Sequence, residues 1–91
     1  MTAGDAALID RFLDMMASEA GAARNTLAAY ANDLRAAAAD LAPARLEQAS
    51  AEDLAGLAPK WRALAGATVG RRMAALRRFF DFLQDEGIRP D

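Results

Sequence analysis

Arginine is the residue type in this sequence best placed to engage a ligand. From Lys60 to Arg78 the chain has six positively charged residues and no Asp or Glu. Guanidinium groups bind phosphate through paired hydrogen bonds, so this segment favours an anionic partner. The plain alternative is a solvated helix face, because arginine is also common on exposed helices. Charge alone supports both interpretations.

The charges are divided unevenly along the chain, although the formal net charge is only -2. Residues 1–59 carry 4 basic and 9 acidic side chains, a balance of -5, whereas residues 60–91 carry 7 basic and 4 acidic side chains, a balance of +3. A polyanion is therefore repelled by the first part and attracted by the second. The same segregation permits a helical protein-interaction or dimerisation module, in which an acidic first helix of one copy meets a basic last helix of another.

The composition argues against catalysis by this fragment. The sequence has no Cys and no His. Disulfides, thiolate metal sites, the commonest general base and the Cys-His and Ser-His nucleophile arrangements are therefore excluded. Tyr30, the single tyrosine, lies on an apolar helix face and is interpreted as a packing residue. We expect no enzymatic activity, no metal, no cofactor and no small-molecule substrate for this fragment.

The start of the chain lacks the basic and apolar regions of a leader peptide, and no apolar run approaches the length of a membrane span. A cytoplasmic protein without membrane contact is expected.

Helices must position the arginines, and 91 residues are enough for one small core. No segment has the alternation of a strand, so the sequence predicts an all-α fold, a small orthogonal bundle of four to five helices. Residues 1–87 are expected to form this domain, and residues 88–91 to begin a polar linker to an absent C-terminal domain. Apolar residues at helical spacing predict helices at about 6–20, 24–41, 51–64 with a break near Pro59, and 67–86.

Short local motifs indicate where these helices begin and end. Asp5 is a candidate N-cap for the first helix, and Ser50 with Asp53 resembles a capping box. Gly21 and Gly87 offer the left-handed conformation that commonly ends a helix.

The helix expected at 67–86 is strongly amphipathic. Arg71, Ala74 and Arg78 project from one side, so two guanidinium groups stand a heptad apart with small side chains between them. Arg77 lies between the faces, and Arg72 lies at the core edge, where its stem can pack. Trp61 and Leu64 precede this helix and are expected in the core. The predicted core face of the helix itself consists of Val69, Met73, Leu76, Phe80 and Leu83.

The helix expected at 24–41 has an outer face of hydrogen-bonding and cationic groups separated by small residues. This composition is typical of a face that contacts a nucleic-acid backbone. The alternative is that Asn25 and Thr26 only satisfy free amides of the first helical turn. The residues of this face are Arg24, Asn25, Ala28, Asn32 and Arg35.

Four segments together form a more specific pattern: LIDRFL at 8–13, NTLAAYANDL at 25–34, ATVGRRMAALRRFFDFL at 67–83 and EGIRPD at 86–91. Their order and spacing resemble the N-terminal core-binding domain of tyrosine recombinases, the phage-integrase family, and are closest to its Xer type. The resemblance covers nearly the whole chain.

The resemblance implies a SAM-like bundle joined by a linker to a C-terminal catalytic domain, which carries the nucleophilic tyrosine. The two domains form a clamp around duplex DNA at a recombination half-site, and other recombinase protomers are further partners. Such a domain serves DNA integration, recombination or chromosome partition by positioning the DNA. The resemblance places these residues toward the duplex: Arg24, Asn25, Ala28, Asn32, Arg35, Thr68, Arg71, Ala74, Arg77 and Arg78.

Overall fold

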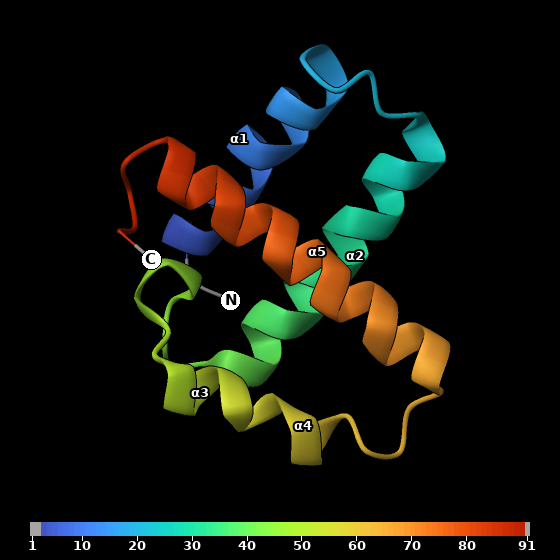
Figure 1. Ribbon diagram of the computed structural model, residues 1–91, viewed down its shortest axis with the longest axis vertical. Helices are drawn as coiled ribbons and strands as arrows, with labels where there is room; N and C mark the ends of the chain where they lie inside the picture. The colour runs from blue at the N-terminus through green and yellow to red at the C-terminus, as the bar shows by residue number, and fades with distance from the viewer. Residues whose placement is uncertain (1–2, 91) are drawn as a thin grey trace.

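Helices make up most of the chain. The computed structural model describes residues 3–90, in which no strand occurs, and the all-α prediction is confirmed. In Figure 1, α5 crosses over α2, α1 lies beside one end of this crossing, and α3 and α4 form the opposite end of the molecule. Within the described residues no helix has the length and apolarity that a membrane span requires. The elements are α1 (Ala3–Ser18), α2 (Arg24–Leu41), the 3-10 helix η1 (Leu46–Gln48), α3 (Ala51–Ala55), α4 (Leu57–Lys60) and α5 (Gly66–Asp85).

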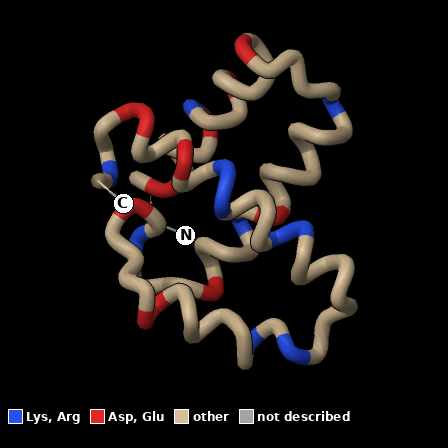
Figure 2. The backbone as a smooth tube through the Cα atoms, viewed as in Figure 1, with Lys and Arg blue, Asp and Glu red and all other residues tan. Residues whose placement is uncertain are grey.

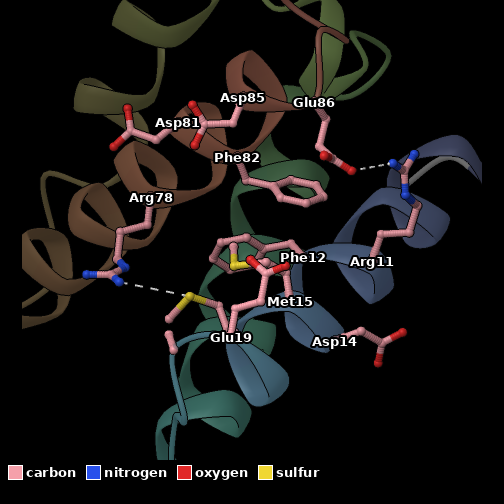
Figure 3. A pocket seen from close by; sticks show the side chains of 12 residues that line it. Arg11, Phe12, Asp14, Met15, Glu19, Arg78, Asp81, Phe82, Asp85 and Glu86 are labelled. Carbon is pink, nitrogen blue, oxygen red and sulfur yellow. Dashed lines mark hydrogen bonds and ion pairs between the residues drawn. The ribbon is translucent and has the colours of Figure 1, made fainter.

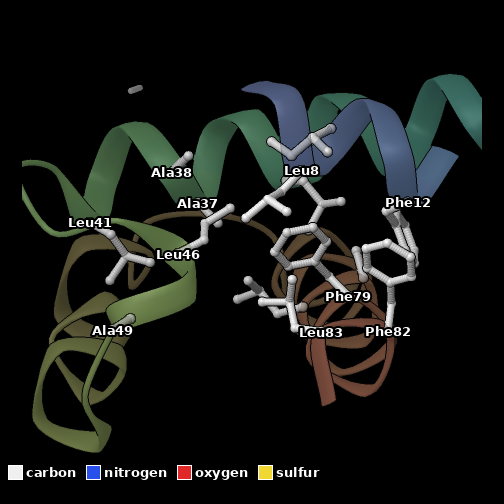
Figure 4. Packing of buried hydrophobic residues seen from close by; sticks show 14 of the residues in the cluster. Leu8, Phe12, Ala37, Ala38, Leu41, Leu46, Ala49, Phe79, Phe82 and Leu83 are labelled. Atoms are coloured by element: carbon white, nitrogen blue, oxygen red, sulfur yellow. The ribbon is translucent and has the colours of Figure 1, made fainter. Parts of the chain in front are cut away.

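Aromatic rings join α1, α2 and α5 at the centre of the bundle. Phe12 of α1 is fully buried, and its ring meets the edges of Phe79 and Phe82 at centroid distances of 5.6 and 5.7 Å. Tyr30 of α2 packs against the same ring at 6.0 Å, as expected for a packing residue. These edge-to-face contacts stabilise the packing beyond the burial of apolar area alone. Figure 4 shows the three phenylalanines between the helices.

A second part of the core lies where the chain leaves α2. Ala37 and Ala38 are buried and small, which lets the connector after α2 approach the helix closely. Trp61 is 2% exposed and its Nε1–H donates to Asp40 Oδ2 at 2.7 Å. Its predicted place in the core is therefore confirmed. Leu64 was expected beside it but is 38% exposed, because the chain turns after α4 toward the start of α5.

The helix-end motifs are mostly confirmed. The Ser50 side chain accepts from the Asp53 amide, and the Asp53 side chain accepts from the Ser50 amide, which completes the capping box. Gly21 and Gly87 adopt φ of 65° and 71° at the ends of α1 and α5. The N-cap predicted at Asp5 is wrong, because α1 begins earlier and Asp5 is buried in its first turn.

Asp5 instead makes a tertiary contact. Its Oδ1 accepts the backbone N–H of Leu46 at 2.9 Å, across 41 residues of sequence. A buried backbone amide at the start of η1 needs an acceptor, and a carboxylate supplies a strong one. This long-range contact outweighs the local preference of Asp for the helix cap.

The interruption of the third predicted helix falls at Gly56 and not at Pro59. Gly56 separates α3 from α4, and Pro59 is the third residue of α4. The amides of a first helical turn have no intrahelical partner, so proline fits there without loss of a hydrogen bond.

The core face of α5 is rotated from the predicted one. Met73 was expected in the core but is 41% exposed, and Val69 and Phe80 are only partly buried. The rotation turns Phe79 and Phe82 toward Phe12, so that two large rings of α5 are buried at once. The buried residues of α5 are Ala75, Leu76, Phe79, Phe82 and Leu83.

Packing continues beyond the end predicted for the domain at residue 87. Ile88 packs against the core, and the Arg89 guanidinium lies over the Phe80 ring at 4.9 Å. Arg89 Nη1 also donates to the carbonyl oxygens of Leu46 and Glu47 at 3.4 and 3.3 Å. The first two residues of the expected polar linker therefore belong to the bundle.

We expect Phe12→Ala to lower the free energy of unfolding by about 3–5 kcal/mol, because it removes a fully buried ring and leaves a cavity. Met73→Ala is the matched control, and a change within about 0.5 kcal/mol is expected at its exposed site. Urea denaturation followed by circular dichroism measures both values. A cost for Met73→Ala similar to that of Phe12→Ala would contradict the rotated face.

Candidate nucleic-acid interface

The outer face of α2 is exposed along its whole length. Leu34, Ala37 and Leu41 are buried on the opposite side, so the 3.6-residue period turns the polar residues outward. Arg24 and Arg35 form no ion pair with any other described residue, which leaves both guanidinium groups open to an added partner. The exposed residues of the predicted site on α2 are Arg24, Asn25, Ala28, Asn32 and Arg35.

The basic residues of α5 lie in the middle turns of the helix. Figure 2 shows blue segments in the middle of α5 near its crossing with α2, further blue segments at the start of α2 and after α4, and red segments along α1 and the last turns of α5. Arg77 is exposed and has no hydrogen-bonded partner among residues 3–90. Thr68 and Ala74 are half-buried. The middle of α5 therefore carries a cluster of four arginines.

Arg71 is fixed to α2 by a two-pronged ion pair. Its Nε–H donates to Asp33 Oδ2 at 2.8 Å and its Nη2–H donates to Asp33 Oδ1 at 3.1 Å. The Asp33 side chain is 2% exposed and the Arg71 side chain 57% exposed. These hydrogen bonds, and then the carboxylate charge, raise the pKa of Arg71 above its ordinary value. This contact joins the two predicted DNA-facing helices.

Arg72 turns the other way, into the fold. Its guanidinium lies over the Trp61 ring at 5.3 Å from the centroid, and its Nε is buried with no hydrogen-bond partner among the described residues. The predicted position of Arg72 at the core edge is confirmed. A cation over the indole face is stabilised by the ring quadrupole, so the Arg72 side chain contributes to the stability of the fold.

Arg78 lies on the α1 side of α5, away from α2. One of its guanidinium nitrogens is 4.0 Å from the sulfur of Met16. It thus lines a groove of about 520 Å³ between α1 and α5, whose floor includes Phe12, Met15 and Phe82 (Figure 3). Acidic side chains dominate the rim and outnumber Arg11 and Arg78; they are Asp14, Glu19, Asp81, Asp85 and Glu86.

The structure therefore separates Arg71 from Arg78, which the sequence placed together on one side. They do share one flank of α5, but Arg71 meets α2 and Arg78 meets α1. Arg11 is further paired with Glu86 at 2.8 Å in the acidic groove. The acidic side chains around that groove repel a polyanion.

Asp33 is the residue of this site that sequence reasoning missed. It was counted as one acidic charge and as part of the motif at 25–34, without a role in the site. A signal was present, since Asp33 precedes the core residue Leu34 and lies at the edge of the apolar face of its helix. A carboxylate in that position needs a cationic partner, because burying an unpaired charge is costly.

Both helices of the site start without a capping side chain. Ala23 and Ala65 occupy the N-cap positions of α2 and α5, and neither has a side-chain acceptor for the first amides. The first N–H groups of a helix carry partial positive charge and bind anions readily. Among residues 3–90 no group of three or more His, Cys, Asp or Glu is placed to hold a metal ion.

Comparison with known proteins gives the same family that the motifs indicated. A family model described as "Phage integrase, N-terminal SAM-like domain" matches residues 9–87. The chain belongs to this family, whose SAM-like fold agrees with the helical bundle.

Curated relatives are tyrosine recombinases of the Xer type. The chain is 51% identical to tyrosine recombinase XerC of Erythrobacter litoralis over 88 residues, which cover 93% of this chain and 27% of the relative. It is 42% identical to tyrosine recombinase XerD of Brucella abortus, over 100% of this chain and 31% of the relative, and 42% identical to XerD of Caulobacter vibrioides, over 90% and 28%. The chain thus spans less than a third of the length of these relatives. No solved structure showed significant similarity.

Arg71→Ala is expected to lower the free energy of unfolding, because it leaves the Asp33 carboxylate buried without its cation. Arg77→Ala, the matched control on the same helix, is expected to change it by no more than about 0.5 kcal/mol. In Asp33→Ala/Arg71→Ala the combined loss should be smaller than the sum of the two single losses. Denaturant unfolding of the four variants tests the contact, and strict additivity would show that the pair is not coupled.

Proposed function

We propose that this chain is the DNA-binding, core-binding domain of a site-specific tyrosine recombinase. It grips duplex DNA at a recombination half-site in the cytoplasm, while a separate catalytic domain of the parent protein, reached through a linker after the bundle, attacks the phosphodiester. Other protomers of the same or a related recombinase complete the assembly. The contribution of this domain is to position the DNA.

The observation that carries this proposal is the set of exposed cations without ion pairs on α2 and α5. Arg24, Arg35 and Arg77 are exposed and have no ion-pair partner among the described residues, although the chain as a whole is acidic. Unpaired guanidinium groups on a rigid helix surface suit phosphate contacts, which release bound counterions from DNA. The uncapped starts of α2 and α5 add backbone amides that can donate to phosphate.

The residues divide into contact types. Arg71 and Arg77 engage phosphates or guanine edges, and Asn25, Asn32 and Arg35 anchor the neighbouring backbone. The small residues Ala28 and Ala74 let the helices approach the duplex closely. Arg24 and Thr68 contact the duplex at the helix starts, and Arg78 does so at the border of the acidic groove.

A second candidate is a protein-interaction module. The acidic groove between α1 and α5 favours it, because an apolar floor with an acidic rim suits a basic helix of another copy. Sedimentation without DNA tests this candidate: self-association that salt abolishes, and that Asp14→Asn/Glu19→Gln weakens, supports it. A monomer at all salt concentrations removes it.

We expect Arg35→Ala/Arg77→Ala to weaken binding of a mixed-sequence duplex and to reduce the slope of log K against log salt. Each lost phosphate contact removes about 0.9 from the slope, so the double variant should lose nearly twice that amount. Fluorescence anisotropy of a labelled duplex between about 50 and 200 mM salt gives both quantities.

Arg45→Ala is the matched control for this titration. Arg45 lies outside the α2 and α5 faces and is paired with Glu47, so removing it changes the net charge without touching the proposed contacts. Its slope should remain that of the unmodified chain. Equal slopes for the control and the double variant, or binding without salt dependence, would contradict the proposed interface.

A further inference from the structure

The Asp33–Arg71 pair leaves part of the guanidinium unused. Arginine has five N–H donors in a planar fork. Asp33 accepts from Nε–H and from one N–H of Nη2, which leaves both hydrogens of Nη1 and the second hydrogen of Nη2. These free donors form a second edge of the fork, suited to two oxygens of one phosphate.

The two partners differ sharply in exposure. Asp33 is 2% exposed and lies within the bundle, whereas Arg71 is 57% exposed. Because the Nε–Nη2 edge bonds the buried Asp33 and the side chain is largely exposed, we infer that the neighbouring Nη1–Nη2 edge is open to solvent. A phosphate can therefore bind the free edge of Arg71 while the hydrogen bonds to Asp33 are kept.

The surface beside Arg71 is free of bulky side chains. Ala67 and Ala74 lie on the same flank of α5, and a Cβ built on the neighbouring Gly70 would meet no atom within 4 Å. A phosphate and its sugar can thus approach the free edge of the guanidinium closely.

We propose that Asp33 is a positioning residue for DNA contact: it holds the Arg71 guanidinium so that the free Nη edge binds one phosphodiester of the duplex at the α2–α5 crossing. This inference rests on the proposed function of the chain. Asp33 does not touch the DNA and acts through Arg71, as a carboxylate that orients a metal-ligating histidine acts through that ligand.

The rival explanation is that Asp33 only stabilises the packing of α2 against α5. The two explanations predict opposite effects of Asp33→Asn on DNA affinity. If Asp33 has only a structural role, Asp33→Asn should bind the duplex as tightly as the unmodified chain or more tightly, because the net charge rises from -2 to -1. A positioning residue predicts weaker binding, because an unrestrained arginine side chain must be ordered when the duplex binds.

The first test compares duplex affinities by anisotropy at one low salt concentration. Asp33→Asn is expected to weaken binding about 3- to 10-fold despite its more favourable net charge. Asp10→Asn, which makes the same charge change at an exposed site on α1, is the matched control and should bind as tightly as the unmodified chain or slightly more tightly. Thermal unfolding confirms that each variant is folded at the assay temperature.

Arg71→Lys keeps a cation beside Asp33 and provides a second route if Asp33→Asn does not fold. Lysine lacks the planar fork and cannot hold a carboxylate and a phosphate on two separate edges at once. Arg71→Lys should therefore weaken duplex binding by a similar factor. The double variant Asp33→Asn/Arg71→Lys should bind duplex no more weakly than Asp33→Asn alone. Wild-type affinity in either folded single variant overturns the inference.

NMR of the guanidinium separates failure of this inference from failure of the proposed function. On addition of duplex, the Arg71 Nε–H resonance should stay in place, since its bond to Asp33 is kept, while the Nη resonances shift. If Nε–H shifts to the position of a free arginine, the duplex replaces Asp33 and the positioning role is wrong. If no variant, nor the unmodified chain, binds duplex in a salt-sensitive way, the proposed function itself fails and the inference fails with it.

Discussion

A carboxylate buried where two helices cross constrains the rest of this small bundle. Asp33 lies at the edge of the core of α2 and is almost inaccessible to solvent. A charge in that place is tolerated only with a cation and hydrogen bonds to match. Arg71 provides both, so the rotation of α5 about its axis and its position along α2 are linked to one ion pair. The aromatic contacts of Phe12 with Phe79 and Phe82 require the same rotation.

That rotation also determines which basic side chains of α5 are accessible to a ligand. With Phe79 and Phe82 buried, Arg77 points outward and Arg72 points toward Trp61. Arg78 falls on the other side, against α1. One helix with four arginines thus presents them to four different environments: an ion pair, an aromatic ring, a thioether beside an acidic groove, and open solvent.

Much of the fold could be predicted from the sequence, because local signals agree with the final packing. Helical spacing gave the class and the approximate positions of α1, α2 and α5, and the capping box and helix-ending glycines were identified from residue type. The outer face of α2 was likewise correct as an exposed surface, since a helix with one buried side leaves the other side open.

What the sequence missed depends on contacts between distant segments. Met73 and Phe80 fit an apolar stripe as well as Phe79 and Phe82 do, and only the presence of Phe12 decides which rings are buried. Asp5 is of a residue type that favours N-cap positions, yet its carboxylate accepts a hydrogen bond from a backbone amide 41 residues away. Arg71 and Arg78 are equivalent on a helical projection, and the partners that separate them belong to α2 and α1. Helical periodicity identifies which residues share one face of a helix, but it does not identify the segments that pack against that face.

The two faces of the molecule have opposite electrostatic character, and this bears on how a domain with a net charge of -2 could bind DNA. The acids of α1 and the last turns of α5 gather around the groove on one side, and Arg11 is neutralised there by Glu86. Exposed cations without an ion pair among the described residues lie on α2 (Arg24 and Arg35), after α4 (Arg62) and on α5 (Arg77). Close contacts sense the local charge, because the contribution of distant groups is screened within about 8–10 Å at ordinary salt. The acidic face disfavours the approach of a polyanion from that side, which supports the proposal that a duplex contacts the faces of α2 and α5.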